Sequence, residues 1–237
     1  MNKDSFKNEL AAKGLNLSAE QLGQFETYLH LIQEWNQKMN LTAITDDSEI
    51  WQKHFYDSVV PFLHTSFQTL CDVGSGAGFP GIPLAIAWPN RSFVLVEPLA
   101  KRCRFLNEVK NQLHLDNVEI VNARAEDFVK EHREQFDAVS ARAVARLSIL
   151  LELCVPLVND SGTFIALKGA NGKEELKNAA PALKALPVVF DHEEEFELGN
   201  DEGTRINFYF KKTGKVPAKY PRPFGTIKKK PLEVTNG

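Results

Sequence analysis

The sequence predicts an α/β protein with a mostly parallel seven-stranded sheet, helices on both faces of that sheet, and a helical extension before it. Three observations predict this class. From about residue 65, short apolar runs alternate with helical stretches. A glycine cluster directly follows the first of those runs. The composition, 43% hydrophobic and 25% charged over 237 residues, is typical of a globular chain.

Residues 1–64 are predicted to form the helical extension and to pack on the core. Apolar side chains recur there at helical spacing, at Leu22, Phe25, Leu29 and Ile32. Ser18 stands before this stretch with Glu20 and Gln21 behind it, so Ser18 is the expected N-cap. A second helical stretch is expected from Asp47 to Leu63.

Residues 65–212 are predicted to form the core domain. Short apolar runs predict five strands, at 70–73, 93–96, 118–121, 136–140 and 163–167. Helical stretches separate or follow them, at 101–115, 147–155 and 173–185. Strands joined through helices predict a parallel sheet with right-handed crossovers. Two later β-rich runs predict a terminal antiparallel hairpin, at 188–198 and 206–210, with Gly199 to Gly203 between them.

Composition and patterning exclude several classes of protein. No apolar run approaches the ~20 residues of a membrane-spanning helix, and the N-terminus lacks the apolar segment of a secretory signal. Cys71, Cys103 and Cys154 are far apart and form no Cys-x-x-Cys pair, so neither a disulfide framework nor a metal site is expected. We therefore expect a cytoplasmic protein with reduced thiols, and a monomer.

Residues 213–237 are predicted to be a basic C-terminal tail. Residues 211–230 contain eight Lys or Arg and no acid, although the whole chain has a net charge of −3. A disordered, solubilising end is the usual interpretation of such a run. Tyr220 and Phe224 among the cations favour contact with nucleic-acid phosphates and stacking on bases. We expect a flexible tail that contacts phosphates without reading sequence.

The glycine cluster is the strongest motif. It reads Asp72-Val-Gly74-Ser-Gly76-Ala-Gly78-Phe-Pro-Gly81 and lies between a predicted strand and a predicted helix. Glycines let a backbone turn tightly and approach a ligand closely, so Gly74, Gly76 and Gly78 are predicted to bind one. The last three glycines match the GxGxxG pattern of dinucleotide-binding folds, which alone is weak evidence for NAD.

Two acids favour a different ligand, S-adenosylmethionine. Asp72 precedes the glycines, where a carboxylate would repel a pyrophosphate and attract an ammonium group. Glu97 ends the second strand, where it can accept hydrogen bonds from both ribose hydroxyls of an adenosine. This arrangement resembles the Rossmann-like methyltransferases over roughly residues 65–210. In that superfamily Glu126, within Arg124-Ala125-Glu126-Asp127, would meet the adenine edge, unless it only caps the following helix.

The stretch after the fourth strand, Ser140 to Arg146, bears on the acceptor. It contains neither the Asn/Asp-Pro-Pro-aromatic motif of exocyclic-amine methyltransferases nor a Pro-Cys nucleophile. Guanine N7 fits, because its free lone pair needs no general base, only in-line placement. Arg124, Arg142 and Lys168 follow strand ends and are the expected catalytic residues, acting by positioning the substrate. Each could instead be a surface salt-bridge partner.

Several motifs together resemble the glucose-inhibited division protein B family, the bacterial small-subunit rRNA guanine-N7 methyltransferases. They are Trp35-Asn36, Asn40-Leu41-Thr42, His54-x-x-Asp57-Ser58, the loop Asp72–Pro83, Lys101-Arg102, Arg124-Ala-Glu126, Ser140-Ala-Arg142-Ala and Leu167-Lys168-Gly169. The tail segment Tyr220-Pro221-Arg222 resembles Gram-positive members, but Phe224 and Ile227 stand where a Pro-Gly-Thr-Pro pattern is common.

The resemblance implies an S-adenosylmethionine-dependent enzyme that methylates N7 of a guanine in the decoding-region loop of 16S rRNA, as rRNA or in a small-subunit precursor. It also implies cofactor-binding roles at Gly74, Phe79, Ala125, Glu126 and Arg142. The alternatives are a methyltransferase of another RNA or a small molecule, and an RNA-binding protein with a vestigial cofactor pocket.

The motif His54-x-x-Asp57-Ser58 places three polar side chains on one helix face. They could line the pocket beside the cofactor. A buried polar network that fixes the N-terminal helices on the sheet is the favoured interpretation.

Overall fold

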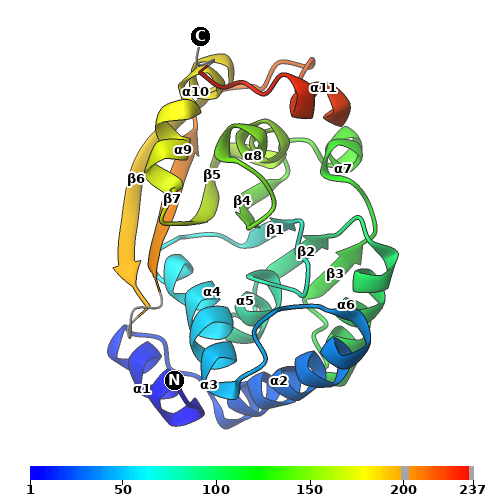
Figure 1. Ribbon diagram of the computed structural model, residues 1–237, viewed down its shortest axis with the longest axis vertical. Helices are drawn as coiled ribbons and strands as arrows, with labels where there is room; N and C mark the ends of the chain where they lie inside the picture. The colour runs from blue at the N-terminus through cyan, green and yellow to red at the C-terminus, as the bar shows by residue number, and fades with distance from the viewer. Residues whose placement is uncertain (199–202, 235–237) are drawn as a thin grey trace.

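The computed structural model describes residues 1–198 and 203–234, and its centre is a seven-stranded sheet in the order β3-β2-β1-β4-β5-β7-β6 (Figure 1). The strands are β1 (Thr69–Val73), β2 (Ser92–Val96), β3 (Val118–Val121), β4 (Phe136–Arg142), β5 (Val158–Gly169), β6 (Val188–Glu197) and β7 (Thr204–Lys212). The first five pair in parallel, and β7 pairs antiparallel with both β5 and β6. The predicted fold class is confirmed. The predicted turn over 199–203 lies largely outside the described residues.

Helices cover both faces of the sheet (Figure 1). One side carries α1 (Lys3–Ala12), α2 (Ala19–Met39), α3 (Asp47–Glu49), α4 (Asp57–Val59), α5 (Gly81–Ala87) and α6 (Ala100–Gln112). The other side carries α7 (Ala125–His132), α8 (Leu147–Cys154), α9 (Gly172–Asn178), α10 (Ala180–Ala185) and α11 (Phe224–Lys229). The helix predicted near 173–185 is thus two short helices, since Pro181 at the start of α10 has no amide hydrogen for a continuous ladder.

Strand residues alternate between two apolar cores. Leu70 of β1 belongs to the core under the N-terminal helices, whereas its neighbours Cys71 and Val73 belong to the core under α7, α8 and α10. This period of two is what a sheet buried on both faces requires. Asp72 therefore points to the same side as Leu70, toward α5.

The N-terminal helices pack on the sheet through aromatic side chains. Phe6, Phe25, Tyr28, Trp51 and Phe55 form a buried cluster with ring centroids 5.0–6.5 Å apart. Helix α2 begins at the predicted N-cap, where the side chain of Ser18 accepts a hydrogen bond from the Gln21 amide. The packing of the aromatic cluster also positions the glycine loop, because the Tyr28 hydroxyl donates to the carbonyl of Ala77 at 2.5 Å.

The single helix predicted over Asp47–Leu63 is a helical run of changing pitch. A π-helical segment, η1 (Ile50–Tyr56), joins α3 to α4, and a 3-10 turn, η2 (Val60–Phe62), follows. Pi-helical turns are rare and frequent at functional sites. Here the segment carries Lys53 and His54 and leads directly into Asp57.

The prediction of a flexible C-terminal tail is wrong for residues 213–234. Val216, Tyr220 and Ile227 are buried in the same core as α8. The Arg133 guanidinium donates to the carbonyls of Val216, Pro217 and Tyr220 at 2.7–3.2 Å. The sequence pattern missed this because apolar residues spaced widely among lysines show no helical or strand period.

Candidate functional site

The glycine loop connects β1 to α5, and three of its glycines adopt backbone conformations that other residues avoid. Gly74, Gly76 and Gly78 have φ values of 73°, 60° and 99°. Space is equally restrictive. A Cβ atom on Gly74 would lie 2.6 Å from Val144, and one on Gly78 would lie 2.6 Å from Ile82. Conformation therefore favours glycine at all three positions, and packing adds to this at Gly74 and Gly78.

The loop forms one wall of a pocket at the carboxyl ends of β1, β2 and β3, which we call the loop pocket. Its lining includes Gly74, Glu97, Pro98, Leu99, Arg102, Arg124, Ala125, Glu126, Val144, Leu153 and Phe224. The fold thus brings together five predicted site residues that are up to 52 positions apart: Gly74, Glu97, Arg124, Ala125 and Glu126. Parallel strands present their carboxyl ends at one edge, which explains the convergence.

Glu97 is the buried acid of the loop pocket. One carboxylate oxygen accepts from the Gly76 amide at 2.9 Å and the other accepts from the Leu99 amide at 2.9 Å. Arg102 lies 3.8 Å from the first oxygen. These contacts orient a charged acceptor at the rim of β2, where it still has lone pairs for further donors.

Asp72 occupies a different place from the one expected of a ligand residue. Its side chain is fully buried and lines neither the loop pocket nor a second pocket at the ends of β4 and β5. It accepts from the Ser140 hydroxyl at 2.9 Å and from the Gly81 amide at 3.2 Å, so it ties β1 to β4 and to the start of α5. Burial raises the pKa of Asp72 to about 6. A contact between Asp72 and an ammonium group stays a prediction.

A second pocket, the strand-end pocket, lies at the ends of β4 and β5. Its lining includes Lys53, His54, Asp57, Arg142, Lys168, Asn171, Glu175 and Arg205. Ala143 lines both pockets and has a φ of 56°, an unusual conformation for a residue with a side chain. The two pockets therefore meet at this residue.

Arg142 lines the strand-end pocket and contacts three of the residues around it. Its guanidinium lies 3.4 Å from Asp57, donates to the Lys53 carbonyl at 3.3 Å, and sits 4.8 Å above the ring centroid of Phe79. The Phe79 ring in turn stacks on His54 at 4.3 Å. Burial lowers the pKa of Arg142, and the nearby Asp57 carboxylate opposes that shift. Arg142 and Phe79, both predicted cofactor residues, lie outside the lining of the loop pocket.

The other two predicted catalytic cations are separated from each other. Lys168 lines the strand-end pocket, where its ammonium group lies 2.7 Å from Glu175 and donates to the Ala145 carbonyl at 2.9 Å. Arg124 instead lies at the loop pocket, 5.9 Å over the Phe224 ring.

Sequence reasoning missed Arg205 and Lys53. Arg205 is the second residue of β7 and lies directly opposite Gly169 of β5, so the antiparallel register brings its side chain to the strand-end pocket, 3.1 Å from Asp57. No local sequence signal marks Arg205, because its partner Asp57 lies 148 positions earlier in the chain. Lys53 lies on the π-helical segment, and its ammonium group pairs with the Glu49 carboxylate at 2.5 Å.

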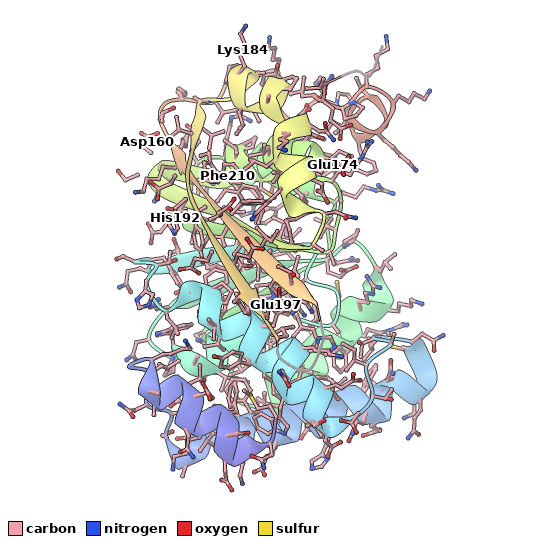
Figure 2. The ribbon with its side chains drawn as sticks, turned by 60° about the vertical axis from the view of Figure 1, so that its left-hand side comes forward. Asp160, Glu174, Lys184, His192, Glu197 and Phe210 are labelled. Carbon is pink, nitrogen blue, oxygen red and sulfur yellow. The ribbon has the colours of Figure 1, made fainter. Side chains whose placement is uncertain are left out.

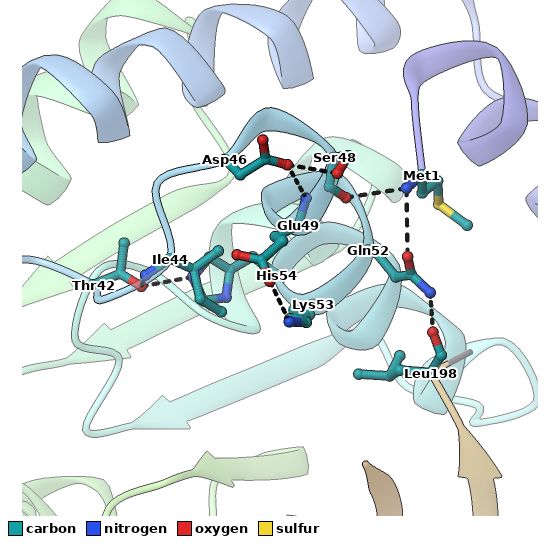
Figure 3. A network of polar contacts seen from close by, with 10 residues as sticks. All are labelled: Met1, Thr42, Ile44, Asp46, Ser48, Glu49, Gln52, Lys53, His54 and Leu198. Carbon is teal, nitrogen blue, oxygen red and sulfur yellow. Dashed lines mark hydrogen bonds and ion pairs between the residues drawn. The ribbon is translucent and has the colours of Figure 1, made fainter. Parts of the chain in front are cut away.

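A polar network fixes the π-helical segment beside the pocket (Figure 3). His54 contacts the Thr42 hydroxyl at 2.9 Å, and that hydroxyl accepts from the Ile44 amide. Gln52 accepts from the N-terminal amino group of Met1 and donates to the carbonyl of Leu198. His54 thus joins a buried network and, with Asp57, lines the strand-end pocket; a place beside the cofactor stays a prediction.

Comparison with known proteins identifies the family. The family model of GidB, rRNA small subunit methyltransferase G, matches residues 21–196. The chain belongs to this family. It is 48% identical to the ribosomal RNA small subunit methyltransferase G of Lysinibacillus sphaericus, and 45% identical to that of Bacillus licheniformis. Both alignments cover 98% of this chain and the whole of the relative, so the resemblance of the motifs is confirmed over the full length.

Solved structures confirm the Rossmann-like methyltransferase fold. An O-methyltransferase from Bacillus cereus in complex with SAH superposes with a TM-score of 0.58 at 15% identity, covering 78% of this chain and 90% of that one. M. jannaschii TYW2 in complex with AdoMet gives 0.55 at 16% identity, covering 72% and 79%. Among residues 1–198 and 203–234, no helix has the length and apolarity to cross a membrane.

Proposed function

We propose that this member of the GidB family transfers a methyl group from S-adenosylmethionine to N7 of a guanine in the decoding-region loop of 16S rRNA. The observation that carries the proposal is the meeting of two unlike pockets at Ala143. One offers a buried acid and apolar walls, and the other offers four basic side chains and two carboxylates, of which Asp57 is buried. A nucleoside cofactor fits the first, and a phosphate-bearing base fits the second.

The residues of the loop pocket fit the adenosine part of the cofactor. Glu97 would accept hydrogen bonds from the ribose hydroxyls, and Glu126 would accept one from the exocyclic amine of adenine. Leu99 and Val144 are 44% and 41% exposed, and such exposed apolar side chains suit the faces of a flat base. The bound cofactor supplies an electrophilic methyl group on a sulfonium.

The strand-end pocket suits a guanine that leaves its stack. Its four cations, Lys53, Arg142, Lys168 and Arg205, outnumber the two carboxylates in its lining, and this excess of positive charge favours the phosphates on either side of the base. An arginine fork also matches O6 of guanine, next to N7. Because N7 has no proton to lose, the chain need only hold the base in line and exclude water.

Asp57 would select guanine among the bases. Its Oδ2 atom is shared between Arg142 and Arg205, but its Oδ1 atom is buried and has no hydrogen-bond partner among residues 1–198 and 203–234. A buried acceptor without a partner costs about 1–3 kcal/mol, so a donor that reaches it is favoured. Guanine carries adjacent N1–H and N2–H donors on the edge opposite N7, and adenine offers an acceptor at N1.

The decisive experiment compares RNA substrates that differ at one atom. A decoding-loop RNA with 7-deazaguanine at the target position lacks the N7 lone pair but keeps the Watson–Crick edge. We expect methyl transfer to the guanine RNA, 7-methylguanosine as the product nucleoside, and no transfer to the deaza RNA. Transfer to both RNAs would refute N7 as the acceptor, and no transfer to any 16S fragment or precursor particle would favour another RNA or a small molecule.

The same proposal extends to partners and place. The substrate is 16S rRNA or a small-subunit precursor in the cytoplasm, and the enzyme acts as a monomer. The edge strand β6 supports a monomer, because it carries five acids, Asp191, Glu193, Glu194, Glu195 and Glu197, and a charged edge disfavours pairing with a second copy. Figure 2 labels Glu197 at the end of this strand. Light scattering on the purified chain tests this, and a dimer mass would overturn it.

A further inference from the structure

We infer that the C-terminal segment, residues 213–234, completes the adenosine site, with Phe224 as one wall against the adenine ring. The inference rests on the proposed S-adenosylmethionine pocket but not on the identity of the methylated base. It replaces the expectation that Phe224 stacks on RNA. The segment follows the last strand of the sheet, and it contributes Phe224 to a pocket lining that otherwise comes from residues 73–153.

A buried ion pair anchors the segment before Phe224. The guanidinium of Arg222 donates to both carboxylate oxygens of Glu152, at 2.8 and 2.6 Å, and its amide donates to the same carboxylate at 2.9 Å. Glu152 lies on α8 and its side chain is fully buried. A two-pronged pair of this kind fixes direction as well as distance.

A second anchor holds the segment after Phe224. Glu233 accepts from the Ser148 hydroxyl at 2.6 Å and pairs with Arg146 at 2.7 Å. Between the two anchors, Ile227 of α11 is fully buried in the core shared with α8. The chain is thus held on both sides of Phe224, and the ring is placed before any ligand arrives.

Phe224 itself is part of the loop pocket. Its partly buried ring packs on the core and lines the pocket together with Leu153, Ala125 and Val144. The guanidinium of Arg124 lies 5.9 Å over the ring. A flat aromatic face is the surface on which a purine stacks, and a ring already held in place loses little entropy when the ligand binds.

S-Adenosylhomocysteine is the probe, titrated by calorimetry into the full chain and into Phe224→Ala. Removing a stacking ring from a base site costs about tenfold in affinity, within a range of roughly fivefold to a hundredfold. Phe224→Tyr keeps the ring and should bind like the wild type. The matched control is Phe190→Ala, which removes a ring from β6, outside the lining of the loop pocket, and should leave affinity unchanged.

The outcomes separate this inference from the function on which it rests. If the wild type binds S-adenosylhomocysteine and Phe224→Ala binds equally well, the wall is not at Phe224. Weaker RNA binding with unchanged S-adenosylhomocysteine affinity would likewise overturn it and restore the RNA-stacking role. A wild type that does not bind the probe at all would refute the cofactor proposal instead. Should Phe224→Ala fail to fold by circular dichroism, Phe224→Leu keeps the apolar packing, and the same loss of affinity is expected.

Discussion

Replacing His54 with glutamine should make the protein's stability less sensitive to acid. His54 is 8% exposed, stacks on Phe79, and receives a hydrogen bond from the Arg142 guanidinium at 3.5 Å. Burial, and then the charge of Arg142, lower the pKa of His54 from 6.5 to about 3. The imidazole is therefore neutral in the folded protein at every pH at which the enzyme would work.

The sign and size of the effect follow from proton linkage. Below pH 6.5 the unfolded chain binds a proton at this histidine and the folded protein does not, so the free energy of unfolding falls as pH falls toward about 3. Between pH 7 and pH 5 the loss amounts to about 2 kcal/mol. The buried carboxyl of Asp72 acts in the opposite direction, because its pKa is raised to about 6 and the folded state takes up its proton first.

Urea unfolding of the wild type and His54→Gln at pH 5, 6 and 7 measures this. Glutamine loses the ring stack, so the variant should be less stable at pH 7. The difference in the free energy of unfolding between the two proteins should be about 2 kcal/mol smaller at pH 5 than at pH 7. The contribution of Asp72 is common to both proteins and cancels in this difference. His30→Gln, at an exposed position, should parallel the wild type. Parallel curves for wild type and His54→Gln would refute a histidine held neutral by this pocket.

Three further predictions address the two pockets and the surface lysines. Glu97→Gln removes the charged acceptor and should weaken S-adenosylhomocysteine binding by about tenfold to a hundredfold in calorimetry; equal affinity would remove Glu97 from the ribose. Arg142→Lys keeps the charge but not the fork, so single-turnover methylation should slow by about a hundredfold while cofactor affinity changes little; normal turnover would assign Arg142 to the fold alone. Changing exposed Lys228, Lys229 and Lys230 together to Gln should flatten the slope of log RNA affinity against log salt by up to about 2, with turnover at saturating RNA preserved; an unchanged slope would place the RNA elsewhere.

Local patterns were sufficient to predict the order of the strands. The run 70–73 became β1 at Thr69–Val73, and 147–155 became α8 at Leu147–Cys154. Such predictions succeed because strand and helix periods are properties of neighbouring residues. The glycine loop was equally predictable, since positive φ at Gly74, Gly76 and Gly78 is a local demand on the backbone.

Contacts between distant segments were decided by the tertiary structure alone. Asp57, Arg142 and Arg205 lie together in one pocket although 148 positions separate the first from the last. The local sequence around each of them does not predict this contact. Arg222 and Glu152 are likewise distant in sequence. Their ion pair holds against α8 a segment whose sequence resembles a solvated run of charges.

The sequence by itself thus predicted the fold, because strand and helix periods and glycine conformations are local properties, and its motifs predicted the family by resemblance. Only the tertiary structure decided which buried charge lines a pocket and which is enclosed by the fold. Asp72 and Glu97 are both buried acids that look alike along the chain, yet one ties β1 to β4 and α5 and the other lines the loop pocket. Burial depends on what the rest of the chain brings to the other side of a residue, and that is settled only when the long-range contacts form.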